Sequence, residues 1–204
     1  MRKPLVYRIL IPIATTWFKF KYKPVIINKE AIPKKGRVII AGTHKSKSDP
    51  LIIGLSTNRC VRGLAKAELF KNPFSRFLFK GLGAIPVHRD SEERASVIPA
   101  CVELLEQEEL IGIMPEGTIN RTNEQIMPFK TGVIRIALEA KTPIVPFAII
   151  GETANNYKSF KKGVKIIFDE PYYPETDNIE KEIKVLEKKV IKLLETGAVQ
   201  NELN

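Results

Sequence analysis

The sequence predicts a single α/β domain with a mixed sheet flanked by helices. Short apolar, β-branched runs alternate along the chain with longer stretches of helical periodicity, a pattern typical of strands joined by helices. A length of 204 residues fits one domain, and 44% hydrophobic residues can form a sizeable core. Since no repeat, low-complexity tract or long linker divides the chain, we expect one domain over residues 25–204, preceded by a separate segment at residues 1–24.

The individual elements follow from local composition. Pro50 suits the first position of a helix, and the last helix carries an apolar stripe at helical spacing. Ser91 and two glutamates open another helix, in which Pro99 either introduces a kink or marks the true start. The predicted helices cover residues 50–55, 69–81, 91–105, 131–140 and 179–194, and the predicted strands cover residues 37–42, 61–65, 84–87, 110–114, 143–150 and 164–168.

An apolar stretch set among cations begins the chain. The uncharged run over residues 9–18 is ten residues long, about half of the roughly 20 that span a bilayer. Pro12 interrupts it, and lysines follow in place of a cleavage site, which argues against a signal peptide. The segment is then either a helix docked on its own domain or an interfacial helix with Trp17, Phe18, Phe20 and Tyr22 at headgroup depth. We favour the interfacial helix, and expect a peripheral protein on the cytoplasmic face of the cell membrane that truncation of residues 1–23 releases.

Positive charge is concentrated in the first part of the chain. The net charge is +10, and residues 1–89 contain only three acidic side chains, Glu30, Asp49 and Glu68. This asymmetry indicates an anionic partner: a membrane surface, a phosphorylated substrate, an acidic carrier protein or nucleic acid. No helix-turn-helix, zinc-module or RNP-like pattern favours nucleic acid, so we expect none to be bound. The two cysteines fit neither a zinc site nor a disulfide framework, which favours buried thiols and no metal site.

One of the two histidines stands in a polar loop just after a predicted strand, in the pattern His44-x4-Asp49. Histidine is the usual general base, and a carboxylate on its second ring nitrogen fixes the tautomer and stabilises the imidazolium. A loop that turns into a helix can bring the two side chains together. By spacing alone, the favoured interpretation is that Asp49 only caps the helix before Pro50 and His44 is an ordinary loop residue.

Further polar residues follow other predicted strands. Lys66 and Arg89 each lie just beyond one strand, and Pro115-Glu116-Gly117-Thr118 follows another. The last of these segments offers backbone N–H groups and a hydroxyl to an anion. Because the carboxyl ends of parallel strands meet at one edge, a single sheet would gather these residues together.

These segments resemble the motif blocks of the glycerolipid acyltransferase family, most closely its 1-acylglycerol-3-phosphate acyltransferases. Four blocks occur in order across about residues 40–150. The first block, N-H-x4-D in the family, corresponds to Thr43-His44-Lys45-Ser46-Lys47-Ser48-Asp49, and the second corresponds to Lys66–Leu69 with Gly83–Arg89. The third block resembles Pro115–Thr118, continuing to Pro128-Phe129-Lys130-x-Gly132, and the fourth resembles Pro143–Pro146.

Three positions depart from the family pattern. Thr43 replaces the usual asparagine, and Ile119 stands where the family has the arginine after Glu-Gly-Thr. The nearest cation, Arg121, lies two residues later and is a candidate replacement. His88 occupies a position that is often acidic in the family, and we interpret it as a bystander.

The resemblance implies transfer of a fatty acyl group to the free hydroxyl of 1-acylglycerol 3-phosphate (lysophosphatidic acid), giving phosphatidic acid. The donor is a thioester of acyl carrier protein or coenzyme A. His44 is the expected general base, oriented by Asp49, without an acyl-enzyme, because a thiol leaves readily and no Gly-x-Ser-x-Gly elbow occurs. No cofactor or metal is implied. The acceptor phosphate is expected to contact Lys66, Arg89, Glu116, Gly117, Thr118 and Arg121.

Two alternatives stay open. The same chemistry fits another acceptor, glycerol 3-phosphate or another lysolipid. A non-catalytic basic module that binds anionic membrane or nucleic acid would instead show salt-dependent binding without turnover. The mass of the product formed from a panel of acceptors separates these possibilities.

Overall fold

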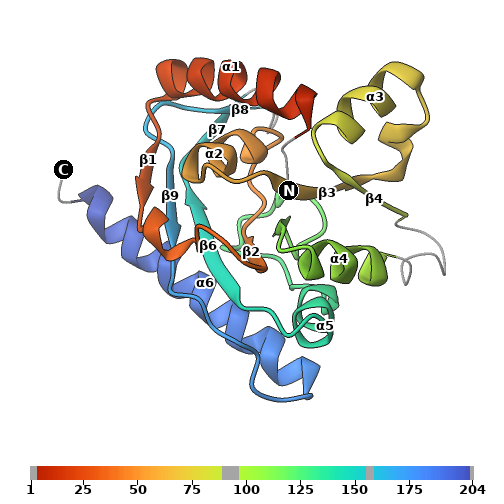
Figure 1. Cartoon of the computed structure of the whole chain (residues 1–204). Coiled ribbons are helices and arrows are strands. Elements are labelled where there is room, and N and C mark those ends of the chain that lie inside the picture. The colour runs from red at the N-terminus through yellow and green to blue at the C-terminus, as the bar shows by residue number, and fades with distance from the viewer. Residues whose placement is uncertain (1–3, 89–96, 155–158, 203–204) are drawn as a thin grey trace.

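A mixed sheet of seven strands forms the centre of the computed structural model, which describes residues 4–88, 97–154 and 159–202 (Figure 1). The strand order is β1-β9-β6-β2-β5-β3-β4, and every neighbouring pair is parallel except β6 with β9. The strands are β1 (Val25–Ile27), β2 (Val38–Gly42), β3 (Val61–Lys66), β4 (Ile85–Val87), β5 (Leu110–Ile113), β6 (Ile144–Ile150) and β9 (Lys165–Phe168). The predicted α/β domain with a mixed sheet is confirmed.

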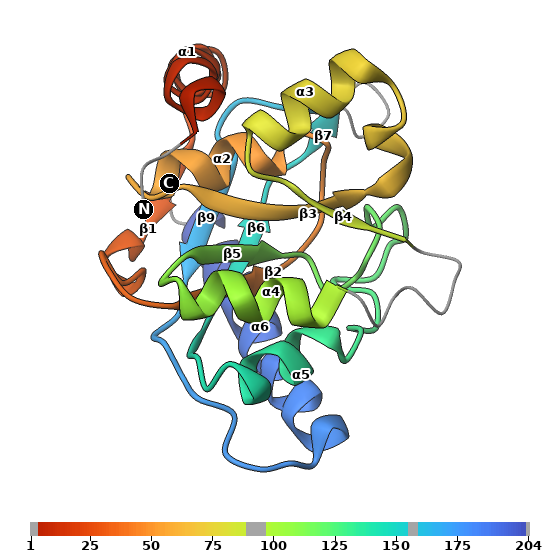
Figure 2. The ribbon, with the colours of Figure 1, turned by 45° about the vertical axis from the view of Figure 1, so that its right-hand side comes forward.

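Helices cover both faces of the sheet. Figure 2 shows α1, α2 and α3 on one side and α4, α5 and α6 on the other. The helices are α1 (Leu5–Tyr22), α2 (Asp49–Ser56), α3 (Pro73–Gly81), α4 (Val97–Glu106), α5 (Gly132–Glu139) and α6 (Ile179–Glu202), with 3-10 turns η1 (Lys29–Ala31) and η2 (Ala67–Phe70). A short hairpin of β7 (Thr153–Ala154) and β8 (Ser159–Phe160) precedes β9.

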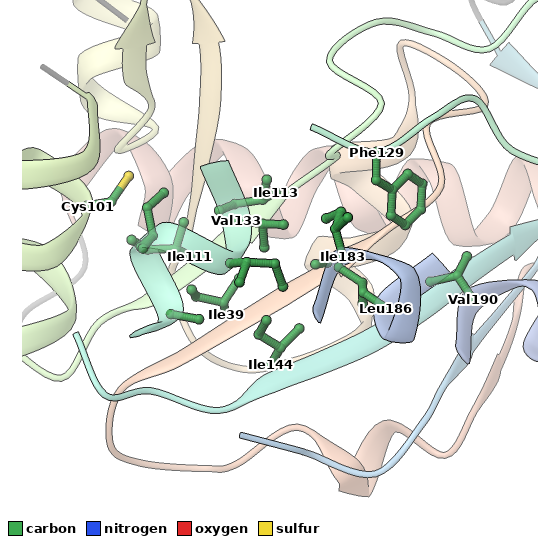
Figure 3. Packing of buried hydrophobic residues seen from close by; sticks show 14 of the residues in the cluster. Ile39, Cys101, Ile111, Ile113, Phe129, Val133, Ile144, Ile183, Leu186 and Val190 are labelled. Carbon is green, nitrogen blue, oxygen red and sulfur yellow. The ribbon is translucent and has the colours of Figure 1, made fainter. Parts of the chain in front are cut away.

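The core is divided by the sheet into two clusters. Successive residues of a strand point to opposite faces, so β2 contributes to both. Ile39 and Ala41 belong to the cluster under α4, α5 and α6, part of which is drawn in Figure 3. Val38 and Ile40 belong to the cluster under α1 and α2. Burial on both faces explains why this strand is an uninterrupted apolar run in the sequence.

The predicted elements occur in the structure, and three short strands of its described part, β1, β7 and β8, were not predicted. β1 is a three-residue edge strand that pairs with β9. The predicted helix over residues 91–105 corresponds to α4, which is described from Val97 onward, and its expected first turn lies outside the described residues. The last helix continues to Glu202, beyond the predicted end at residue 194.

One face of α1 is docked on the domain, and the opposite face is exposed and apolar. Phe18 is fully buried against Phe160, and Tyr22 is also buried. The expectation that these two side chains lie at headgroup depth is therefore wrong, because they pack into the core of the domain. The large apolar side chains on the outer face are Leu5, Ile9, Leu10, Ile13, Trp17 and Phe20. The helix therefore has features of both predicted alternatives, a docked helix and an interfacial one. In the described part of the chain, every helix falls short of the length or apolar character needed to cross a bilayer.

The candidate site lies at one edge of the sheet. β2, β5, β3 and β4 are neighbours and mutually parallel, so their carboxyl ends and the loops that follow meet there. His44 follows β2, Pro115 follows β5, Lys66 ends β3 and His88 follows β4. The predicted gathering of strand-end residues is present in the structure.

Candidate active site

The loop after β2 turns back so that the first residue of α2 reaches the histidine ring. Nδ1 of His44 lies 2.6 Å from Oδ2 of Asp49. The same carboxylate accepts hydrogen bonds from the backbone N–H groups of Lys45 and Ser46, both at 3.0 Å. The five-residue spacing therefore forms a tight turn in which one carboxylate holds both the ring and the backbone of the loop.

The environments of the two side chains differ. Asp49 is fully buried, whereas the side chain of His44 is 20% exposed and lines a pocket. Burial raises the pKa of the Asp49 carboxyl above its ordinary value, and hydrogen bonds from His44 and from the backbone of Ser46 and Lys45 oppose this rise. With Nδ1 occupied by Asp49, Nε2 is the ring nitrogen that is left for a substrate proton.

The loop after β5 holds the backbone of His44 from the other side. Oε1 of Glu116 accepts the N–H of His44 at 2.7 Å, and the N–H of Asn120 donates to the carbonyl oxygen of His44 at 2.8 Å. Oε2 of Glu116 accepts the N–H of Met127 at 2.9 Å. Burial raises the pKa of Glu116, and these two backbone hydrogen bonds oppose the rise. Both carboxylate oxygens thus bind the protein's own backbone.

Replacing Glu116 by alanine should destabilise the fold and lower turnover, because the N–H groups of His44 and Met127 lose their acceptor. A buried N–H group without a partner costs roughly 1–3 kcal/mol. Glu116→Gln keeps one acceptor oxygen and should lose less. Chemical denaturation measures the first effect, and the rate of acyl transfer measures the second. A Glu116→Ala variant as stable as the wild type would contradict this positioning role.

An apolar pocket with cationic side chains lies beside His44, between the carboxyl edge of the sheet and the helices α4 and α5. Its volume is about 770 Å³. Its large apolar lining residues are Leu64, Val87, Val97, Ile98, Ile113, Phe129, Val133 and Ile136, and its basic residues are His44, Lys66, His88, Lys130 and Arg135. No aspartate or glutamate is among the described lining residues. Such a pocket suits a molecule with an apolar chain and an anionic group.

The structure separates the residues that were expected to bind an anion. Lys66 and Gly117 line the pocket together with His44, whereas Thr118 and Arg121 lie outside its lining. Arg89, the remaining predicted cation, lies outside the described residues.

Three residues of the site were missed by sequence reasoning. Lys130 and Arg135 line the pocket, and the buried Asn120 holds the loop through hydrogen bonds to Thr122 and Glu124. The sequence could have indicated Lys130, since this residue belongs to the Pro-Phe-Lys segment just before a predicted helix. No sequence pattern could have indicated Asn120, because its contact with His44 is made by its backbone.

Comparison with known proteins agrees with this geometry. Residues 23–150 match the model of the Acyltransferase family, and the chain belongs to that family and is an acyltransferase. Two relatives named 1-acyl-sn-glycerol-3-phosphate acyltransferase come from Bacillus subtilis and Borreliella burgdorferi. The first is 35% identical over 72% of this chain and 73% of its own length. The second is 36% identical over 66% of this chain and 53% of its own length.

A solved structure has the same fold. The crystal structure of the 1-acyl-sn-glycerophosphate (LPA) acyltransferase PlsC from Thermotoga maritima superposes with a TM-score of 0.72 at 23% sequence identity. The match covers 94% of this chain and 78% of the other.

Proposed function

We propose that this acyltransferase moves a fatty acyl group from an acyl thioester to the free hydroxyl of 1-acylglycerol 3-phosphate, giving phosphatidic acid. The observation that carries the proposal is the His44–Asp49 pair beside an apolar pocket that has unbalanced positive charge. The pocket offers apolar surface to a fatty chain and cations to a phosphate. The names of the two relatives support this choice of acceptor.

In the proposed mechanism, Nε2 of His44 removes the proton of the acceptor hydroxyl as its oxygen attacks the thioester carbonyl. The Nδ1–H group keeps its proton and donates a hydrogen bond to Asp49, whose carboxylate stabilises the imidazolium. The tetrahedral intermediate expels the thiolate of the donor, which takes up the proton. A thiol has an ordinary pKa of about 8.5, so this departure needs no covalent acyl-enzyme.

The reaction is tested by incubating the protein with 1-acylglycerol 3-phosphate on anionic vesicles and identifying the product by mass. Acyl carrier protein and coenzyme A thioesters of the same chain are compared to identify the donor. Glycerol 3-phosphate and phosphate-free 1-acylglycerol are parallel acceptors. We expect phosphatidic acid as the main product. Absence of phosphatidic acid with both donors, or preference for glycerol 3-phosphate, would contradict the proposal.

We further propose that the protein binds the cytoplasmic face of an anionic cell membrane through a surface formed by α1 and α3. The two helices lie side by side in Figures 1 and 2, and they approach so closely that a β-carbon on Gly81 would lie 2.6 Å from Cβ of Val6. The exposed apolar side chains of α3 are Phe74 and Phe77. The cations on or beside the two helices are Arg8, Lys19, Lys21, Lys23, Lys71, Arg76 and Lys80. Exposed aromatic residues among cations favour an anionic lipid interface.

Replacing Trp17 and Phe20 by glutamate should weaken binding to phosphatidylglycerol-containing vesicles by at least about tenfold, because burying a large apolar side chain contributes roughly 1.5–3 kcal/mol. Both side chains face solvent, so the fold should stay intact. The same result is expected for Phe74→Glu with Phe77→Glu. Tyr173→Glu, at another exposed aromatic residue, is the matched control. Vesicle sedimentation measures the effect, and wild-type binding by both double variants would contradict the proposed surface.

A further inference from the structure

The loop that holds His44 also fixes the position of a lysine in the same pocket. The backbone N–H of Lys130 donates to the carbonyl oxygen of Pro115 at 2.9 Å. The side chain of Lys130 then lies across Gly117, where a β-carbon would be 2.7 Å from Nζ and 2.8 Å from Cε. Gly117 also has φ +71°, which disfavours any other residue. Glycine at position 117 therefore leaves the space through which the lysine enters the pocket.

A short series of contacts connects this lysine to the catalytic histidine. The backbone of Lys130 is hydrogen-bonded to Pro115, and its side chain packs on Gly117. Glu116 lies between these two residues in the sequence, and its carboxylate accepts the N–H of His44. In 1-acylglycerol 3-phosphate the hydroxyl and the phosphate are on adjacent carbons. A group that binds this phosphate must therefore lie close to the base and keep a fixed position relative to it.

Lys130 is available for such a contact. Lys130 and Lys66 are exposed residues that line the pocket, and the ammonium group of neither has a hydrogen bond or ion pair within the described residues. The carboxylate of Glu116, in the same loop, already accepts hydrogen bonds from two backbone N–H groups. Arg121, the other basic residue of the loop after β5, does not line the pocket.

We infer that Lys130, together with Lys66, binds the phosphate of the acceptor and so places its hydroxyl at His44. This inference rests on the proposed function and assigns to Lys130 the contact that the sequence had assigned to Arg121. Arg135 also lines the pocket, but it lies on α5 and not in the loop that holds His44.

The test compares Lys130→Met with the wild-type protein. We expect KM for 1-acylglycerol 3-phosphate to rise about 10- to 100-fold, the loss that follows removal of a charged hydrogen bond. KM for the thioester should stay unchanged, and so should the rate with phosphate-free 1-acylglycerol. Lys130→Arg should restore much of the affinity. Lys188→Met, which removes an exposed lysine from α6, is the control for net charge and should behave as the wild type.

A binding measurement without a thioester separates this inference from the proposed reaction. Calorimetry with a short-chain 1-acylglycerol 3-phosphate should show the same loss of affinity in Lys130→Met. If the wild type binds this acceptor but forms no phosphatidic acid, the proposed function fails while a loss of binding in the variant still supports Lys130. An unchanged KM and unchanged binding in Lys130→Met would overturn the inference, as would absence of binding to the wild type.

Discussion

Replacement of His44 by alanine is expected to lower the turnover of acyl transfer by about 10²–10⁴-fold, the usual contribution of a general base. The hydroxyl of the acceptor must lose its proton as it attacks, and His44 is the ring whose Nδ1 is held by a buried carboxylate. The side chain is partly exposed and adds little to the core, so the fold and vesicle binding should be retained. Turnover is measured at saturating acceptor and thioester on anionic vesicles.

The second histidine provides a matched control for this experiment. His88 lines the same pocket, but the carboxylate of Asp49 is bound to the ring of His44. His88→Ala should therefore keep most of the turnover. Turnover near the wild-type value in His44→Ala would contradict the mechanism, whatever the result for His88.

Replacement of Asp49 by asparagine is expected to lower turnover by about 10²-fold or more, although the side chain keeps its size. The amide can donate its N–H to Nδ1 of His44, which would place the ring proton on Nε2 and remove the lone pair that accepts the hydroxyl proton. The imidazolium formed in the reaction also loses its negative partner. Single-turnover rates measure this effect independently of product release.

Comparison with Asp49→Ala separates the chemical effect from the structural one. With its amide nitrogen turned toward His44, asparagine keeps an acceptor oxygen for the N–H of Ser46 but not for the N–H of Lys45, which binds the same oxygen as His44. Alanine leaves both N–H groups without a partner, at a cost of roughly 1–3 kcal/mol each. The asparagine variant should therefore be inactive and intermediate in stability, and the alanine variant should be the less stable of the two in denaturation. An active Asp49→Asn variant would mean that the carboxylate only caps α2.

Most of the fold was predictable because its central strands are buried on both faces. β2 is an apolar run without interruption, and such a run indicates a strand from local sequence alone. β1 was missed because three residues carry little local signal, and its pairing is with residues about 140 positions later. For α1, both faces are apolar, so its periodicity could not distinguish the buried Phe18 from the exposed Phe20.

The site was predictable where it depends on local geometry. The pairing of His44 with Asp49 is made within one turn of the chain, and it was expected once the other motif blocks were found beside the His44-x4-Asp49 spacing, which alone favoured a simple helix cap. The role of Glu116 could not be predicted, because its carboxylate binds the backbone N–H of His44, a residue 72 positions away in the sequence. A motif shows which residues are present at a site, but a side chain that holds the backbone and a side chain that binds the substrate have the same appearance in a sequence.

The contact between α1 and α2 has a consequence for the orientation of the reaction centre. Side chains of Thr15 and Ile11 on α1 lie within ordinary contact distance of a β-carbon placed on Gly54 of α2. α2 begins at Asp49, so the helix with the apolar outer face packs directly on the helix that supplies the carboxylate. The tilt that α1 adopts in a lipid layer would then set the angle at which His44 faces that layer. Deleting residues 1–23 would remove Phe18 and Tyr22 from the core as well, so attachment is better altered by changing the outer face than by shortening the chain.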